Sequence, residues 1–367
     1  MRRKREDQSG VGVTHQEIHG GEVDAFAEAY QTPREHWIDL STGINPVAFP
    51  IPDLAREYWH RLPDSGVDAW LREAAATRYG VADPAYVIPC SGSQAAIQWL
   101  PRLIPATRVA VLGPTYRDHT ASWAWADCQV SEVTSLEQIP ADADVVVVVN
   151  PNNPDGRTID PERLLVVAKS RLLVVDEAYA DLVPDISVAA AVGRTNLLVL
   201  RSMGKFFGLA GMRLGFCLTS EPIASQLRQA FGPWPVSGPA AVVGAVALAD
   251  EGWSQSTRVR LKAAAARLDG ILVRAGLAIA GGTSLFRLVE ARRAAELFEH
   301  LVRAAILVRR FHDQPQRLRF GIPADDVAFE RLNEALGTWR NATANGGNQG
   351  LSRSRGLRDG LNAPIVP

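Results

Sequence analysis

Lys205 lies in the segment whose residue types are best suited to chemistry. Glycines and apolar residues surround it, and it follows an apolar run at residues 197–200 that is typical of a buried strand. A lysine in such surroundings can form a Schiff base with a carbonyl compound, and the flanking Ser202 and Arg213 carry a hydroxyl and a guanidinium suited to a phosphate. The alternative is that Lys205 merely ends a strand and Arg213 begins a helix. A Schiff-base lysine beside a phosphate site is typical of pyridoxal phosphate (PLP) binding.

Four apolar runs in the middle of the chain end in polar residues. The runs cover residues 108–112, 145–149, 172–175 and 197–200, and they are followed in turn by Tyr116, Asn153, Asp176 and Lys205. Continuous apolar runs predict strands covered on both faces, as in a parallel α/β sheet. Ligands of such sheets bind beyond the carboxyl ends of the strands. We therefore expect an aromatic ring, an amide, a carboxylate and a lysine at one edge of a mostly parallel sheet.

Each of these side chains suits a part of PLP. Asp176 can keep the pyridine nitrogen protonated, so that the ring accepts electrons; a structural ion pair is its alternative role. Asn153 and Tyr179 can hydrogen-bond the phenolic oxygen of the ring. Tyr116 can stack on the ring face, and ordinary core packing is its alternative.

A loop of small residues provides a second phosphate-binding feature. Gly92, Ser93 and Gln94 lie between a strand-like segment at residues 86–88 and a helix-like segment at residues 95–100. Backbone N–H groups at a helix N-terminus bind anions, and the helix dipole favours this. A plain helix cap would have similar residues, but phosphate is the ligand that we expect.

Two arginines are candidates for binding the substrate. Arg319 is set in a short apolar strand, and arginine is the residue that binds a carboxylate with two parallel hydrogen bonds. An exposed arginine at a strand end is the competing interpretation. Arg309, with its neighbour Arg310, follows the apolar residues 306–308 and adds positive charge suited to a second anion on the substrate.

The composition is that of an ordinary soluble protein. The chain has 367 residues, 47% hydrophobic and 22% charged, with a formal net charge of −1, which gives no reason to expect nucleic acid or a membrane as partner. Its basic start is followed by acidic and polar residues, so no secretory signal is expected. Cys90, Cys128 and Cys217 have no metal-ligand spacing, which predicts reduced thiols in a cytoplasmic protein without a metal site.

The hydrophobic pattern changes after about residue 235, which predicts two domains. We expect a large cofactor-binding domain at residues 49–235 and a smaller α+β domain at residues 236–340. The N-terminal segment 19–48 has no repeating α/β unit and is expected to join the small domain. Residues 1–18 are expected to form a flexible tail, and residues 341–367, which lack hydrophobic periodicity, a disordered one.

Three motifs together resemble the fold-type I PLP enzymes of the class I/II aminotransferase superfamily. They are Asn150-Pro-Asn-Asn-Pro-Asp-Gly156, Asp176-Glu-Ala-Tyr179, and Ser202-Met-Gly-Lys205 through Arg213, and the resemblance covers about residues 19–340. His19-Gly-Gly21, the Leu40–Pro46 turn and two later segments resemble in particular the threonine-phosphate decarboxylases of cobalamin biosynthesis, which are relatives of histidinol-phosphate aminotransferase.

This resemblance implies a homodimeric lyase that decarboxylates L-threonine O-3-phosphate to (R)-1-aminopropan-2-ol O-phosphate. It implies that His19, Gly20 and Asn45 lie near the substrate and that Arg319 holds its carboxylate. The cofactor residues do not distinguish a decarboxylase from a histidinol-phosphate or related aminotransferase. A non-catalytic partner subunit in cobinamide synthesis is the alternative of another class, and the intact set of Lys205, Asp176 and Arg213 argues against it.

The chain departs from the family pattern at two positions. Leu62 stands where family members often have a tyrosine that reaches the cofactor phosphate of the partner subunit, and a leucine cannot make that hydrogen bond. Gly43 stands where some decarboxylases have an asparagine. The resemblance therefore does not assign the residues that bind the substrate phosphate.

Overall fold

The large domain is built on a seven-stranded sheet. The computed structural model describes residues 20–346, and the order of the strands in this sheet is β2-β8-β7-β6-β5-β3-β4. The bounds are β2 Val87–Cys90, β3 Arg108–Leu112, β4 Gln129–Val133, β5 Val145–Val149, β6 Leu172–Asp176, β7 Leu197–Ser202 and β8 Gly215–Thr219. The four apolar runs of the sequence are the adjacent strands β3, β5, β6 and β7, and each pairs with its neighbour in parallel. This confirms the predicted α/β fold with a mostly parallel central sheet.

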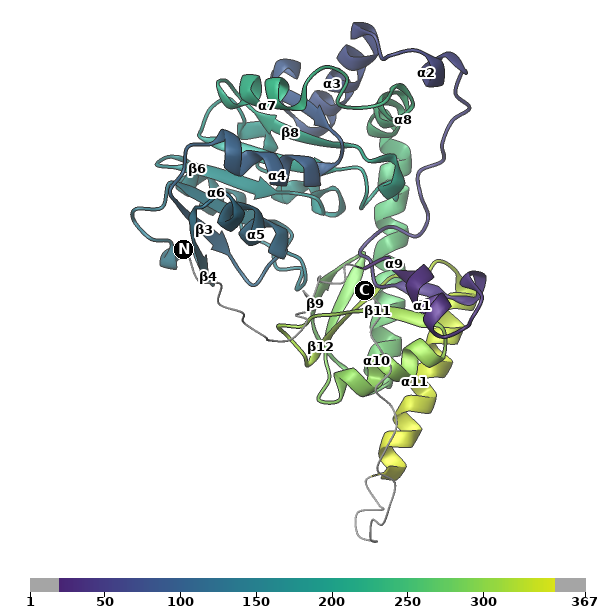
Figure 1. Cartoon of the computed structure of the whole chain (residues 1–367). Helices are drawn as coiled ribbons and strands as arrows, with labels where there is room; N and C mark the ends of the chain where they lie inside the picture. The colour runs from purple at the N-terminus through teal and green to yellow at the C-terminus, as the bar shows by residue number, and fades with distance from the viewer. Residues whose placement is uncertain (1–19, 347–367) are drawn as a thin grey trace, which may run out of the picture.

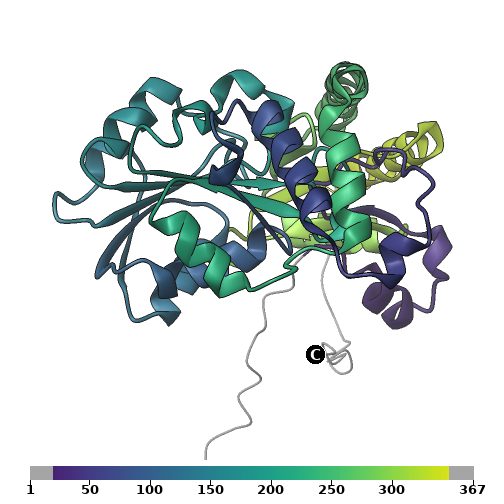
Figure 2. The ribbon, with the colours of Figure 1, turned by 90° about the horizontal axis from the view of Figure 1, so that it is seen from above.

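Helices cover both faces of this sheet (Figure 2). They are α3 Ser65–Tyr79, α4 Ser93–Leu103, α5 Arg117–Trp125, α6 Pro161–Ala168, α7 Ile223–Phe231 and α8 Gly238–Ala249. Successive residues of a strand point to opposite faces, so Val146 and Val148 join the core under α3, α6 and α8, whereas Val145 and Val147 join the core under α4 and α7. Burial on both faces explains why the runs are apolar at every position.

Two strands of this sheet, β8 and β4, were not predicted from the sequence. β8 is antiparallel to both of its neighbours, β2 and β7. β4 lies at the edge of the sheet, and most of its residues are exposed or half-buried. An edge strand with polar side chains has no continuous apolar run, which is why its sequence carries little signal.

The small domain has a five-stranded sheet in the order β1-β11-β12-β10-β9. Its strands are β1 Ile38–Leu40, β9 Ala278–Thr283, β10 Phe286–Glu290, β11 Ile306–Arg310 and β12 Arg317–Gly321, and its helices include α1 Val23–Ala29, α10 Ala294–Arg303 and α11 Asp326–Gly346. β1 comes from the N-terminal segment and pairs in parallel with β11, whereas the other pairings are antiparallel.

Helix α9, Glu251–Arg274, joins the two domains and appears in Figure 1 as the long helix that spans them. Leu261 packs in a core of the large domain, and Leu268 packs in the core of the small domain. Helix α8 packs against α3 of the large domain. Residues beyond 235 thus also pack on the large domain, because α8 lies against α3 and Leu261 of α9 joins the same core.

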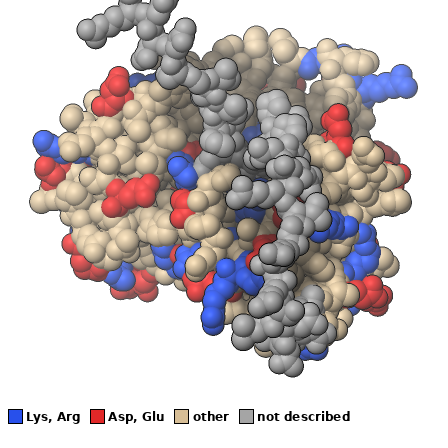
Figure 3. Space-filling view, turned by 60° about the horizontal axis from the view of Figure 1, so that its bottom comes forward, with Lys and Arg blue, Asp and Glu red and all other residues tan. Residues whose placement is uncertain are grey.

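Two predictions concern the ends of the chain. Helix α11 runs to Gly346, so residues 341–346, which were expected to be disordered, are helical. The N-terminal tail expected at residues 1–18 lies outside the described residues. The same is true of residues 347–367 of the expected C-terminal tail. On the face drawn in Figure 3, acidic and basic side chains are interspersed over the uncovered surface. Among residues 20–346, no helix is long and apolar enough to cross a membrane.

Candidate active site

Asp176 is the last residue of β6, and its carboxylate is buried, with 4% of the residue exposed. Its Oδ2 lies 2.9 Å from Nε2 of His119, which is itself 2% exposed. Its Oδ1 accepts a hydrogen bond from the backbone N–H of Ala178 at 3.0 Å. A buried carboxylate needs such partners, and together they fix the plane of the Asp176 carboxyl group.

His119 is a residue of this site that could not be identified from the sequence. It lies on α5, the helix that begins directly after Tyr116, and its ring meets that of Tyr116 edge-on at 6.1 Å between centroids. The available signal was its position three residues after a predicted site residue, at the start of the helix that follows β3. A lone histidine on a helix does not by itself indicate a functional role. Its partner Asp176 is 57 residues further along the chain, so local sequence does not predict their contact.

Tyr116 and Gln94 both donate hydrogen bonds to the carboxylate of Asp118. The hydroxyl of Tyr116 donates to Asp118 Oδ2 at 2.9 Å, and Gln94 Nε2 donates to the same oxygen at 2.5 Å. Burial and the neighbouring Asp118 raise the pKa of Tyr116, which keeps its hydroxyl protonated at neutral pH. These bonds hold the Tyr116 ring between the first turn of α4 and the first turn of α5, next to His119.

The predicted phosphate loop and Arg213 form a cradle without room for further side chains. Gly92 has φ of +80°, and a Cβ atom there would come within 2.6 Å of Arg213 Nη2. A Cβ atom at Gly215 would overlap the backbone nitrogen of Ser93. Ser93 begins α4, whose N-terminus has no side-chain cap, so its N–H groups and the Arg213 guanidinium suit an anion.

Lys205 and Tyr179 lie close together at the carboxyl ends of β7 and β6. The Nζ of Lys205 is 5.8 Å from the centroid of the Tyr179 ring, which also packs edge-on against Phe286 of the small domain. A Cβ atom at Gly43 would lie 2.6 Å from the Tyr179 hydroxyl. Glycine at position 43, a departure from the family pattern, therefore leaves room for that hydroxyl.

Arg319 is a buried cation whose Nε atom has no hydrogen-bond partner among the described residues. Its Nη1 donates to Asn153 Oδ1 at 2.6 Å and its Nη2 to the Ser41 carbonyl at 2.8 Å. Burial lowers the pKa of Arg319, and Tyr179 and Asp39 oppose this effect. The hydrogen bond to Asn153 joins the two domains, because Asn153 follows β5 and Arg319 lies on β12.

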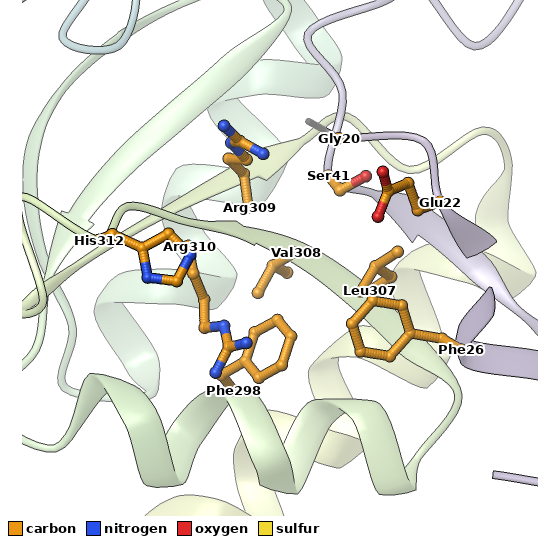
Figure 4. A pocket seen from close by; sticks show the side chains of 10 residues that line it. All are labelled: Gly20, Glu22, Phe26, Ser41, Phe298, Leu307, Val308, Arg309, Arg310 and His312. Carbon is orange, nitrogen blue, oxygen red and sulfur yellow. The ribbon is translucent and has the colours of Figure 1, made fainter. Parts of the chain in front are cut away.

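Arg309 and Arg319 are directly opposite each other on the paired strands β11 and β12. Side chains at paired positions point to the same face of a sheet. Figure 4 shows the Arg309 side chain directed away from Arg310, whose guanidinium stacks on Phe298 at 4.0 Å. Arg309 and Arg319 therefore place two cations at neighbouring positions of the sheet.

The other predicted substrate residues have different surroundings. Asn45 is buried, and its Nδ2 donates to the carbonyl of Phe206 at 2.8 Å while its backbone N–H donates to that of Lys205 at 2.9 Å. Its amide therefore braces the segment after Lys205. Gly20 packs against the backbone of Ser41, and His19 lies outside the described residues. Contact of Asn45 and Gly20 with substrate stays a prediction.

Comparison with known proteins places this site in a family. Residues 35–336 match the family model for aminotransferase class I and II. The chain belongs to the class I and II aminotransferase family. It is 44% identical to a threonine-phosphate decarboxylase of Pseudomonas aeruginosa over 87% of this chain and 96% of that protein. It is 43% identical to a threonine-phosphate decarboxylase of Sinorhizobium sp, over 87% and 97% of the two chains.

The fold of this family member is also that of a solved relative. The structure of histidinol-phosphate aminotransferase from Sinorhizobium meliloti in complex with pyridoxal-5'-phosphate superposes with a TM-score of 0.76 at 20% identity, over 92% of this chain and 99% of that one. The residues of the present site fit the same cofactor. Gly92, Ser93 and Arg213 offer an anion cradle, Asp176 offers a buried carboxylate, and Lys205 offers an amine at the same edge of the sheet.

Proposed function

We propose that this family member is a PLP-dependent decarboxylase of L-threonine O-3-phosphate, which forms (R)-1-aminopropan-2-ol O-phosphate and carbon dioxide for cobalamin biosynthesis. The observation that carries the proposal is the 43–44% identity, over nearly the whole length of two relatives, to proteins named threonine-phosphate decarboxylase. The paired arginines support it, because a phosphorylated amino acid has two anionic groups to bind.

One set of residues in the site serves the cofactor, and another set binds the substrate. PLP, when bound, supplies a ring that withdraws electrons from the bond broken at the substrate Cα. Asp176, which His119 orients, would hold a proton at the pyridine nitrogen of the cofactor, and Lys205 would hold the cofactor covalently through its amine. Arg319 holds the carboxylate that leaves, and Arg309 attracts the substrate phosphate. Asn153 fixes Arg319 through their hydrogen bond.

Decarboxylation and transamination by such a site differ in which substrate bond is held perpendicular to the ring. The main alternative is therefore a histidinol-phosphate or related aminotransferase. Incubating the PLP-loaded protein with threonine phosphate, with and without 2-oxoglutarate, separates the two reactions. We expect carbon dioxide release that is independent of the keto acid. Amino transfer to 2-oxoglutarate without carbon dioxide would establish the aminotransferase instead.

We also propose that the protein is a cytoplasmic homodimer. Large apolar side chains are exposed along α2 Glu57–His60, the segment that follows it, α3 and the turn before α8; they are Trp59, Leu62, Trp70 and Trp234, with exposed fractions of 42–67%. Exposed apolar groups of this size mark interfaces. The three cysteines are free thiols, as in proteins of reducing compartments. Sedimentation should give twice the mass of the chain, and a fully active monomer would contradict the dimer.

A further inference from the structure

Two glycine-containing segments bring the backbones of the two domains into direct contact. A Cβ atom at Gly156, in the loop after β5, would overlap the carbonyl oxygen of Gly282 on β9. A Cβ atom at Gly281 would overlap the carbonyl oxygen of Asp155. Gly156 has φ of +73° and Gly281 of +158°, which also disfavour side chains. We call this contact of residues 155–156 with residues 281–282 the glycine seam.

The large-domain side of the seam is held firmly in place. The carboxylate of Asp155 accepts hydrogen bonds from Asn152 Nδ2 and from Arg157 Nη1, both at 2.8 Å. The backbone N–H of Gly156 donates to the Asn152 carbonyl at 2.9 Å, and Arg157 Nη2 donates to the Gly113 carbonyl at 2.9 Å. The loop is therefore a rigid surface, and Asn153 is part of it.

On the small-domain side, Gly281 of the seam and Arg319 lie in one row of paired residues across the sheet. Gly281 pairs with Leu288 on β10, and Leu288 pairs with Arg319 on β12. Neighbouring strands are about 4.8 Å apart, so the seam and the Arg319 backbone are about 10 Å apart along one row of the sheet. The row meets the large domain at two points, the glycine seam and the hydrogen bond from Arg319 to Asn153.

We propose that the glycine seam fixes how far the Arg319 side chain extends into the active site. Gly156 and Gly281 are then positioning residues for binding the substrate carboxylate. A side chain at either position must push β9 away from the loop. Because β9, β10 and β12 form one hydrogen-bonded sheet, Arg319 moves with them. The cofactor residues Asp176, Ser202, Lys205 and Arg213 all belong to the large domain and stay in place. This inference rests on the proposed role of Arg319.

The test compares Gly156→Ala and Gly281→Ala, one on each side of the seam, with Gly276→Ala. Gly276 is the matched control, because it has φ of +78° in the small domain and its Cβ would meet nothing within 4 Å. A misplacement of about 1 Å can lower the rate about 100-fold. We expect both seam variants to lower kcat/KM for threonine phosphate by about 10- to 100-fold, with PLP content unchanged and Gly276→Ala close to the wild type.

Binding of the product separates positioning from general damage. The amine phosphate lacks the carboxylate but keeps the phosphate assigned to Arg309, whose strand β11 pairs with β12. Its affinity should therefore fall clearly less than that of threonine phosphate in the seam variants. In combination with Arg319→Lys, a seam substitution should cause little further loss. Activity within twofold of the wild type, loss of PLP, or an equal loss of affinity for substrate and product would overturn the proposal.

Hydrogen exchange of the PLP-loaded protein tests the seam without any substrate. Gly156→Ala should speed exchange at residues 278–283, and Gly281→Ala should speed it at residues 150–157, each by at least about fivefold relative to Gly276→Ala. Unchanged exchange across the seam would contradict the proposal even if the wild type decarboxylates threonine phosphate. Wild-type protein that releases no carbon dioxide would instead disprove the proposed function and leave this readout intact. If one variant does not fold, the variant on the other side carries the test.

Discussion

The Nε2 atom of His119 lies 2.9 Å from Oδ2 of Asp176, and both side chains are almost completely buried. A carboxylate in that environment can have only a few orientations. The histidine at one oxygen and the Ala178 N–H at the other aim the Asp176 carboxyl group.

Asp176→Asn should fold and bind PLP but lose most of its turnover. An amide cannot hold a proton on the pyridine nitrogen, and removing a charged partner in a buried site costs a few kcal/mol, which is on the order of 100-fold or more in rate. Steady-state rates at equal PLP content are the measurement. A soluble variant with near-normal turnover would show that Asp176 has only a structural role.

His119→Asn should lower the rate less, by about tenfold. The variant keeps the Asp176 carboxylate but removes the hydrogen bond that orients it. A tenfold loss corresponds to about 1.4 kcal/mol, close to the lower end of the 1.5–3 kcal/mol that a hydrogen bond to a charged group contributes. Combining His119→Asn with Asp176→Asn should cost little more than Asp176→Asn alone, since the two residues act as a pair. Additive losses in the double variant would mean that His119 acts independently.

Lys205→Ala should abolish turnover while the folded protein retains PLP loosely. The amine at position 205 is the group assigned to covalent attachment of the cofactor. Borohydride reduction of the wild type, followed by peptide mapping, should place the trapped cofactor on Lys205. A label on another lysine, or none after PLP has been added, would disprove the assignment.

Arg319→Lys should weaken binding of threonine phosphate by roughly tenfold to a hundredfold, because lysine cannot make two parallel bonds to a carboxylate. The amine product should bind with unchanged affinity, and PLP content should stay the same. Both constants can be read from titrations followed by cofactor absorbance. Equal weakening of substrate and product binding would argue that Arg319 does not contact the carboxylate.

Arg201→Met should destabilise the fold. Arg201 is buried between Glu177 and Asp181, at 2.7 and 3.0 Å, so its loss removes the ion pair of the buried Glu177 and leaves the buried Asp181 with Arg78 at 3.4 Å. Breaking such a cluster costs about 3–5 kcal/mol. Arg163→Met removes an exposed ion pair with Glu137 and should cost at most about 1 kcal/mol. Urea unfolding measures both, and similar midpoints for the two variants would contradict the prediction.

The sequence by itself determined the features that depend on local order. Strands β3, β5, β6 and β7 are apolar at nearly every position because both faces are buried, so their existence and parallel arrangement could be predicted. Because parallel strands end at one edge, the placement of Asn153, Asp176 and Lys205 followed as well. The small residues at 92–94, which precede a helix, likewise predicted a phosphate-binding loop.

Only the tertiary structure decided the relationships between distant segments. The pairing of His119 with Asp176, the register that sets Arg309 opposite Arg319, and the seam between Gly156 and Gly281 join residues 57, 10 and 125 positions apart. The packing of α9 on two cores was likewise hidden, because a helix that packs on two cores in succession keeps one periodic pattern throughout. Hydrophobic periodicity reports which face of an element is buried, and it does not report what that face is buried against.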